Sequence, residues 1–214
     1  PPPFGNFAIF ARDADSADIA REGKPLVDCG LPAGIAFLNG GTPEQLDAVG
    51  GLGFVHGESM PVMSVTPGSL AETTLPDGYT FRQTGADEAD AWARAVSDGY
   101  GLPLAVGSLF GADRAESRAP GKTRFYAAEH KGQLVATSLL YLHDGLAGIY
   151  GVATLPEHRG KGLGAHLTAE PLRIAWRDGY TTGLLQASEM GAPVYTRIGF
   201  RTHGHMELVL RLPG

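Results

Sequence analysis

The chain has 214 residues and a formal net charge of −6 at pH 7. This length allows one large domain or two small ones. The negative charge excludes a general nucleic-acid binder, because binding to phosphates needs a basic surface, and it favours a cationic or neutral substrate. Cys29 is the single cysteine, which excludes a disulfide framework and a CxxC metal site and is typical of a cytoplasmic protein. There is no run of about 18 apolar residues, so we expect no membrane span.

The first third of the chain has strand-like and helix-like patterns and is followed by a segment in which the apolar pattern is interrupted. The expected elements are a strand over 6–11, a mixed segment over 13–24, a strand over 34–39, a helix over 44–52 and an extended segment over 54–66. In residues 67–78, two prolines and two glycines interrupt the apolar pattern. This interruption predicts a linker.

The remaining elements are clearer. They are a strand over 79–84, a helix over 88–100, a short helix in a loop over 101–117, a hairpin over 123–143, a third strand over 145–155, a helix over 164–179, a strand over 183–188, a short helix over 192–198 and a last strand or strand pair over 200–212. Thr84 or Asp87 is expected to cap the first of these helices. Pro171 predicts a kink in the long helix, and Gly179 predicts its end. The order indicates a mixed α/β fold that starts antiparallel and has a later crossover.

Two segments resemble each other at an offset of 146 residues. "LGFVHGESM" (52–60) and "IGFRTHGHM" (198–206) share Gly-Phe and Met at the same spacing, and the same offset aligns residues 36–46 with 182–192. They are either two unrelated units with a common Gly-Phe turn, or two copies of one unit. A true repeat would pair Tyr195 with Val49 and the loop 159–164 with "DADSAD" (13–18), so the first copy would lack both features.

The segment "PEHRGKGLG" (156–164) lies at a strand-to-helix junction. Glycines let the backbone turn tightly, and the N-terminus of a helix presents free N–H groups and a partial positive charge. Arg159 and Lys161 add charge, so the loop is suited to a phosphate or pyrophosphate group. A P-loop is excluded, because Glu116 stands where Gly is needed before Gly121-Lys122-Thr123.

Three interpretations of this loop remain. Gly160, Gly162 and Ala165 satisfy a dinucleotide fingerprint, but that motif belongs in a first βαβ unit with an acid at the end of the next strand. A glycine-rich turn that binds nothing is the second interpretation. The third is the pattern R-x-x-G-x-G, which Arg159, Gly162 and Gly164 satisfy.

On that third pattern, residues 79–210 resemble the GNAT superfamily of acyl-CoA-dependent N-acyltransferases. The likeness rests on "GVATLPEHRGKGLGAHL", on "LLQASEMGAPVYTRIGF" downstream, and on the order of the elements. The resemblance implies an α/β fold with a mixed, mainly antiparallel central sheet flanked by helices. The N-terminal third would be a partial, degenerate second copy. The expected domains are therefore 1–66 as a half-domain, 67–78 as a linker and 79–214 as the acetyltransferase domain.

The resemblance also implies a binding site for acetyl-CoA. The loop amides would bind the coenzyme A pyrophosphate, and the preceding strand would pair its main chain with the pantetheine arm in a V-shaped slot beside the next strand. Ser188 stands where the family often has an Asn that contacts pantetheine. The matching positions are Arg159, Gly160, Lys161, Gly162, Leu163 and Gly164 for the loop, Val152 and Thr154 for the strand, and Ser188.

The implied reaction is attack of an amine on the thioester. Tyr195 matches the family's general acid, which would protonate the departing sulfur. The Glu that some members use as a base is replaced by Gly148, which leaves His143, Asp144, Tyr150, Glu189 or water as candidates, of which His143 and Glu189 are the expected ones. His203 and His205 lack a third ligand, so we expect no metal.

We therefore expect a cytoplasmic N-acetyltransferase that uses acetyl-CoA and a small-molecule amine or peptide acceptor, with no nucleic-acid or membrane partner. The apolar stretch 101–118 matches the family's acceptor-binding region. A homodimer is a further partner prediction. Three alternatives stay open: an acyl-CoA-binding pseudoenzyme or sensor, a nicotinamide oxidoreductase, and an interaction module whose N-terminal half pairs strands with another subunit.

Overall fold

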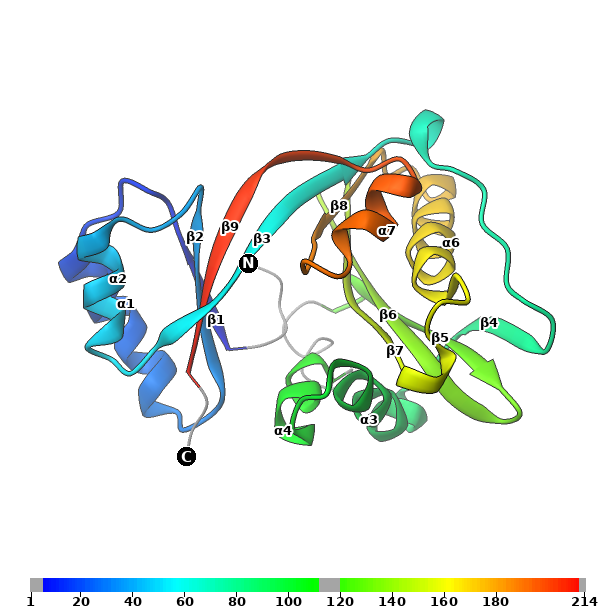
Figure 1. The fold of residues 1–214 in the computed structure, drawn as a ribbon, viewed down its shortest axis with the longest axis horizontal. Helices are drawn as coiled ribbons and strands as arrows, with labels where there is room; N and C mark the ends of the chain where they lie inside the picture. The colour runs from blue at the N-terminus through cyan, green and yellow to red at the C-terminus, as the bar shows by residue number, and fades with distance from the viewer. Residues whose placement is uncertain (1–5, 112–119, 212–214) are drawn as a thin grey trace.

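In the computed structural model, residues 6–111 and 120–211 are described, and they form one nine-stranded sheet with helices on both faces (Figure 1). The strand order is β1-β2-β9-β3-β8-β7-β6-β5-β4. The strands are β1 (Phe7–Phe10), β2 (Ala33–Leu38), β3 (Val55–Val65), β4 (Tyr79–Gln83), β5 (Thr123–His130), β6 (Gln133–His143), β7 (Leu146–Thr154), β8 (Thr182–Gln186) and β9 (Arg201–Arg211). The helices are α1 (Ser16–Asp28), α2 (Pro43–Gly50), α3 (Ala89–Tyr100), α4 (Leu104–Gly107), α6 (Leu163–Arg177) and α7 (Ala192–Arg197). The predicted mixed, mainly antiparallel fold is confirmed.

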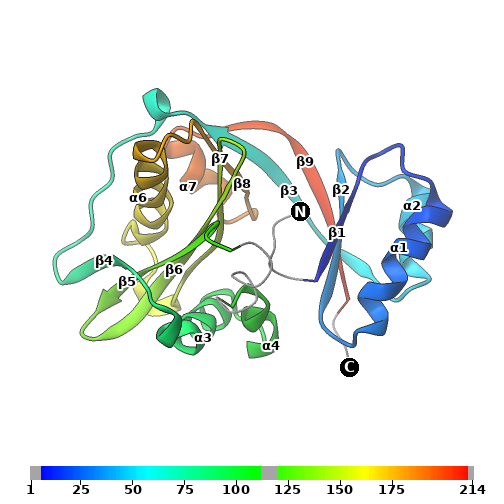
Figure 2. The same cartoon turned by 180° about the vertical axis from the view of Figure 1, so that it is seen from behind.

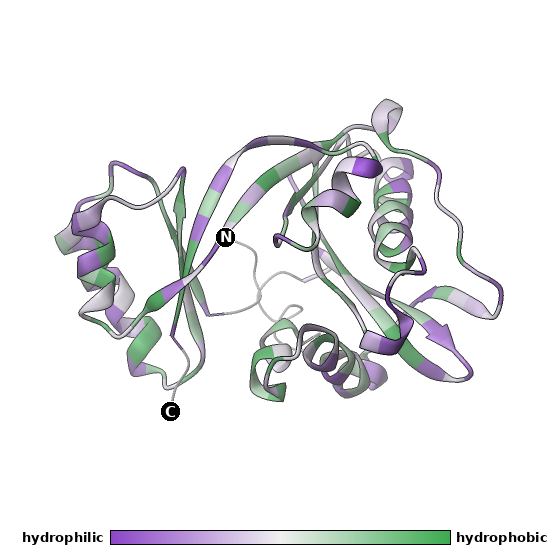
Figure 3. Cartoon of the chain, in the orientation of Figure 1, coloured by the Kyte–Doolittle hydropathy of each residue, from purple (hydrophilic) through white to green (hydrophobic). Residues whose placement is uncertain are grey.

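Strands β4 to β7 form an antiparallel meander, and α6 crosses over to bring β8 parallel to β7. Helix α3 packs Trp92 and Val96 on one face of the sheet, which we call the α3 face. On the opposite, α6 face, Leu172 and Tyr195 pack against Met63 of β3. Helices α1 and α2 cover β2 and β9 on this same α6 face. Figure 3 shows that α1 and α6 carry both hydrophilic and hydrophobic residues, as expected for helices that pack one side on a sheet.

Two local expectations differ from the structure. Instead of the mixed segment expected over 13–24, the chain forms helix α1, which begins at Ser16, where the Asp15 side chain accepts the N–H of Ala17. Neither Thr84 nor Asp87 caps α3, because a 3₁₀ turn over Ala86–Glu88 precedes the helix and the Glu88 side chain accepts the N–H of Gly85. The last segment is the single strand β9. The predicted helix end at Gly179 is confirmed, with φ of 95° just beyond α6.

The N-terminal third is built into the sheet of the remaining chain. Strand β3 lies between β8 and β9, and β9 lies between β2 and β3. Each of the two long strands therefore completes the sheet of the other part of the chain, as the crossing of β3 and β9 in Figures 1 and 2 shows. The expected linker is not free of the fold, because the Thr73 side chain contacts His166 of α6 and the Ala71 carbonyl accepts from Arg173.

The two ends of the sheet are arranged alike around the β3–β9 pair. On one side β2 is parallel to β1, and on the other β8 is parallel to β7. Met60 and Met206, which are 146 residues apart, lie directly opposite each other in this pair. The 146-residue offset does not extend to β2 and β8. Ile35 of β2 pairs with Val209 of β9, and Leu185 of β8 pairs with Met63 of β3, which is 146 residues before Val209. Ile35 and Leu185 therefore occupy equivalent positions, but their separation in the sequence is four residues more than the offset. The sequence alignment of residues 36–46 with residues 182–192 is therefore four residues out of register with the pairing of these strands. The repeat itself stays a prediction.

Candidate functional site

The candidate site begins where β7 and β8 separate. Their parallel pairing covers only three positions and ends at Gly148 opposite Leu184, although β7 continues to Thr154. From Ile149 onward, no strand in the described part of the chain pairs with the β7 edge that faces β8. Val152 and Thr154 both lie on this stretch. Gly151 adopts a positive φ of 57° here, and a side chain at that position would collide with Trp92 of α3. The glycine therefore lets β7 bend away while α3 stays packed on it.

The glycine loop connects the end of β7 to α6. Gly160 and Gly162 have φ of 74° and 80°, and Gly162 occupies the N-cap position of α6. No side chain caps this helix end, and its first turn has no acidic residue. The first backbone N–H groups of α6, at Leu163 and Gly164, therefore have no carbonyl one turn earlier and remain available to a ligand.

The basic side chains of the loop hold it in place. Arg159 donates to the carbonyl of Gly99 at 2.8 Å, at the end of α3, and to that of Thr154 at 3.2 Å. Lys161 donates to the Tyr79 hydroxyl at 3.0 Å and to the Glu157 carbonyl at 3.2 Å. These contacts fix the path of the loop between α3 and β4. The backbone amides are thus the groups left to contact an anion directly.

Tyr195 lies on α7, where α7 meets the separated strands. It is 9% exposed and packs against Phe200. Burial raises the pKa of Tyr195 to about 12, an effect that its hydrogen bond with Thr168 of α6 partly opposes. The group is therefore a neutral phenol at working pH, as a proton donor must be.

Tyr100, the last residue of α3, is a neighbour of this site that sequence reasoning missed. Tyr100 is 42% exposed as a residue, but desolvation of its hydroxyl, together with Tyr195 and the negative charge of Glu58 on β3, raises its pKa. Glu58 was also missed. It comes from the N-terminal third, and no local pattern indicates that β3 reaches the site. The one sequence feature that includes Glu58 is the segment 52–60 of the predicted repeat, which rests only on the shared Gly-Phe and Met.

Ser188 and Glu189, in the loop after β8, have defined partners. Ser188 accepts the N–H of Gly191 on its hydroxyl oxygen at 3.1 Å, and so supports the start of α7. The backbone N–H of Glu189 donates to Oε1 of Glu58 at 2.6 Å. The side chain of Glu189 is exposed. The structure thus brings Ser188 and Glu189 to the open end of the slot.

His143 is not brought to this end. It ends β6, is half exposed, and contacts Asp144 at 3.3 Å in the turn that leads into β7. This turn lies at the paired end of β7 and β8, about 20 Å from Val152 at the usual rise per strand residue. Tyr150, another candidate base, lies on β7, and burial raises its pKa to about 12. The distance argues against His143 as the base.

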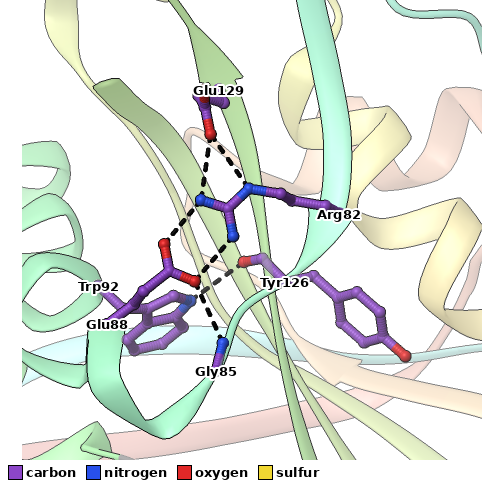
Figure 4. Close-up of polar contacts among 6 residues, drawn as sticks. All are labelled: Arg82, Gly85, Glu88, Trp92, Tyr126 and Glu129. Carbon is purple, nitrogen blue, oxygen red and sulfur yellow. Dashed lines mark hydrogen bonds and ion pairs between the residues drawn. The ribbon is translucent and has the colours of Figure 1, made fainter. Parts of the chain in front are cut away.

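A network of charged side chains holds the start of α3 against β4 and β5 (Figure 4). Arg82 of β4 contacts Glu88 at 2.6 Å and Glu129 of β5 at 3.0 Å. The Arg82 guanidinium lowers the pKa of Glu88 to about 2. Beside it, the Trp92 indole donates to the Tyr126 carbonyl at 3.0 Å. These contacts fix the start of α3, the helix whose other end carries Gly99 and Tyr100.

In the described part of the chain, no group of three or more His, Cys, Asp or Glu side chains is placed to hold a metal ion. None of the described helices is long and apolar enough to cross a membrane.

The separated strands, the glycine loop and the neutral tyrosine agree with a family match. Residues 121–202 match the family described as acetyltransferase (GNAT) domain. The chain contains a GNAT acetyltransferase domain. The matched segment of this GNAT domain includes β5 to β8, the glycine loop, α6 and α7.

The GNAT domain also has curated and structural relatives. The chain is 32% identical over 150 residues to the mycothiol acetyltransferase of Streptomyces griseus, in an alignment that covers 65% of this chain and 48% of that protein. The chain thus spans about half the length of the curated relatives that it matches.

Two solved structures show the same fold at low identity. A GCN5-related N-acetyltransferase from Kribbella flavida is 22% identical with a TM-score of 0.63, covering 97% of this chain and 78% of that one. A tandem GNAT protein from the clavulanic acid biosynthesis pathway, solved without AcCoA, is 16% identical with a TM-score of 0.57, covering 92% and 69%. Both likenesses extend over the N-terminal third as well as the GNAT domain.

Proposed function

We propose that this chain is an N-acetyltransferase that moves the acetyl group of acetyl-CoA to an amine by direct attack. The separation of β7 from β8, between the glycine loop and Tyr195, is the observation that carries the proposal. It offers a strand edge for an extended pantetheine arm, with anion-binding amides at one end and a proton donor beside it. The match of residues 121–202 to the GNAT domain supports the same assignment.

In this proposal the chain's own groups have distinct tasks. The amides from Arg159 to Gly164 bind the pyrophosphate of coenzyme A, helped by the partial positive charge of the α6 N-terminus. Val152 and Thr154 pair their main chain with pantetheine, as a peptide adds to a sheet edge. The N–H near Val152 polarises the thioester carbonyl. Ser188, which keeps a hydroxyl proton to donate, contacts the pantetheine amides.

Tyr195 then supplies the proton to the departing thiolate. Attack by the neutral amine forms the C–N bond, and collapse of the tetrahedral adduct breaks the C–S bond. We propose a small-molecule amine as the acceptor, and the name of the curated relatives, mycothiol acetyltransferase, supports a low-molecular-weight acceptor rather than a protein. A cytoplasmic location, a peptide acceptor and a homodimer remain predictions from the sequence.

Thiol release from acetyl-CoA, measured across a panel of amines, amino acids and peptides, tests the proposal. We expect release with at least one amine, and acetylated product by mass spectrometry. Because Gly148 replaces the family's Glu, an acyl-CoA-binding sensor is the second candidate function. Tight calorimetric binding of acetyl-CoA with no thiol release across the panel would favour the sensor, and binding of NAD instead of coenzyme A would exclude both.

A further inference from the structure

Glu58 lies on the α3 face of the sheet because of a bulge in β3. The register between β3 and β9 shifts between His56 and Glu58, so Gly57 is an extra residue with no partner of its own. In a regular strand Glu58 would share a face with His56. The bulge instead turns Glu58 to the α3 face, opposite Leu208 and in line with Met60 and Val62.

The carboxylate of Glu58 meets the chain where β8 ends. Val62 of β3 pairs with Gln186, the last residue of β8, and Pro61 accepts the N–H of Ala187. Four residues before Val62, Glu58 accepts the N–H of Glu189 on Oε1 at 2.6 Å. The contact fixes one carboxylate oxygen. For Oε2, no hydrogen bond or ion pair is found among residues 6–111 and 120–211.

Glu58 is partly buried, and its surroundings suit a cationic amine attached to an apolar body. Tyr100 of α3 is close enough for the Glu58 charge to act on it. The exposed apolar residues Leu102 and Leu104 follow Tyr100 along the chain, and the exposed Met190 follows Glu189. Within residues 6–111 and 120–211, the ionisable residues that interact with Glu58 are Tyr100 of α3 and Glu189 after β8. None of these side chains carries a positive charge that would neutralise Glu58.

We propose that Glu58, supplied by the N-terminal third of the chain through β3, is the catalytic carboxylate on the acceptor side: it binds the ammonium group of the acceptor and takes its proton. The inference rests on the proposed acetyltransferase function. It gives a base to a site in which Gly148 stands where some members of the family have a Glu, and it gives β3 a chemical role.

The proton balance of the step is simple. The Glu58 carboxylate accepts one proton from the bound ammonium, which leaves a neutral amine with a free electron pair. The amine attacks the thioester carbon, and loss of the thiolate, protonated by Tyr195, gives the amide and free coenzyme A. The second amine proton leaves with the collapse of the adduct and restores the phenol, and Glu58 releases its proton to solvent.

Glu58 fits this task better than Glu189 or His143. Glu189 contributes its backbone N–H, and its side chain is exposed. His143 lies at the paired end of the slot, beside Asp144. Glu58 has one oxygen anchored and a partly buried side chain that faces α3.

The chain offers a matched control in Glu207. This residue of β9 accepts the N–H of Gly41 on Oε2 at 2.9 Å, after β2, much as Glu58 accepts that of Glu189 after β8. However, Glu207 points to the α6 face, where it contacts His56 at 3.2 Å. Glu58→Gln and Glu207→Gln both keep an oxygen for the backbone contact and remove a charge, but only the first removes it from the slot.

The experiment measures binding of S-aminoethyl-coenzyme A and its neutral isostere S-propyl-coenzyme A by calorimetry. We expect the unaltered protein and Glu207→Gln to prefer the ammonium probe by about tenfold or more, as a charge-assisted contact in a partly buried site allows. Glu58→Gln should bind both probes equally, with its affinity for acetyl-CoA unchanged. With an acceptor found in the amine panel, Glu58→Gln should also lower kcat by about 10²-fold or more, and Glu58→Asp should recover part of it.

The possible failures are distinct. If the unaltered protein binds neither probe nor acetyl-CoA, the proposed function is wrong and the inference is lost with it. If acetyl-CoA binds but the ammonium probe is not preferred, or if Glu58→Gln keeps the preference or a kcat within threefold, the function stands and the role of Glu58 is overturned.

Discussion

The sharpest single test of the site is Tyr195→Phe, because this change removes one oxygen and keeps the ring against Phe200. As a general acid, the Tyr195 phenol should contribute about 10²-fold to kcat, equal to about 2.7 kcal/mol of transition-state stabilisation. The hydroxyl also contacts Thr168, and loss of that one hydrogen bond should cost about 0.5–1.5 kcal/mol of unfolding free energy. The effect on rate should therefore exceed the effect on stability.

The pKa of Tyr195 makes the expected pH profile specific. At a pKa of about 12, only about one phenol in ten thousand is ionised at pH 8. The unaltered enzyme should therefore show no loss of kcat from Tyr195 ionisation below about pH 11. Three measurements separate these effects. Thiol release under acetyl-CoA saturation gives kcat, thermal melting gives the stability, and calorimetry gives the affinity for acetyl-CoA.

Tyr180→Phe is the control for Tyr195→Phe. Tyr180 packs against the same hydrophobic cluster but lies just beyond the C-terminal end of α6, near the paired end of β7 and β8. The Tyr180→Phe variant should keep the kcat of the unaltered protein. If Tyr195→Phe retains kcat within threefold, or if it loses acetyl-CoA binding as strongly as it loses rate, Tyr195 is not the acid.

Three further changes test other parts of the structure. Gly162→Asp should abolish acetyl-CoA binding in calorimetry, because it strains a positive φ and places a carboxylate at the anion site, whereas Asp introduced at Gly132, in the β5–β6 turn with the same φ of 80°, should leave binding intact. Glu88→Gln should lower the melting temperature above pH 4.5, where the folded-state pKa of about 2 makes the pair with Arg82 fully stabilising. The difference from the unaltered protein should shrink as pH falls towards 2, and a constant difference would refute the assignment. Deletion of residues 1–66 removes β3 and should abolish cooperative melting; a folded deletion variant that binds acetyl-CoA would show that the GNAT domain is independent of the N-terminal third.

Much of the GNAT domain could be predicted from the sequence because its signals are local. The Lys131-Gly132 turn of the hairpin has positive φ at both residues, as the sequence pattern "KG" between two strands indicates. Trp92 and Val96 fall on one helix face and are buried together. The glycine loop is recognisable because it needs particular residue types at fixed spacing. Helix α1 was missed because Pro25 and few apolar residues weaken its pattern, and its burial of Ile19 becomes evident only against β2.

The pairing of β3 and β9 could not be predicted, because strand partners are set by contacts between residues far apart in the sequence. A strand of alternating apolar residues pairs equally well with many others, and the sequence of β3 does not name β8 as its neighbour. Glu58 was missed for the same reason. Its role depends on the Gly57 bulge, which turns its side chain, and on β8, which is more than 120 residues away in the chain.

The interlocked sheet changes what the N-terminal third means for function. If this third were a separate decayed copy, its residues would be free to vary without effect on the site. In the sheet, β3 instead pairs with the edge of β8 that faces away from the slot and so supports that strand, and β9 lies between β2 and β3. The folding of each part therefore depends on a strand from the other. A part that must stay folded to support β8 is also placed to contribute a side chain, and the side chain of Glu58 on β3 accepts a hydrogen bond from the loop after β8. The contribution of the N-terminal third is thus made through β3, whether or not this third is a copy of the later unit.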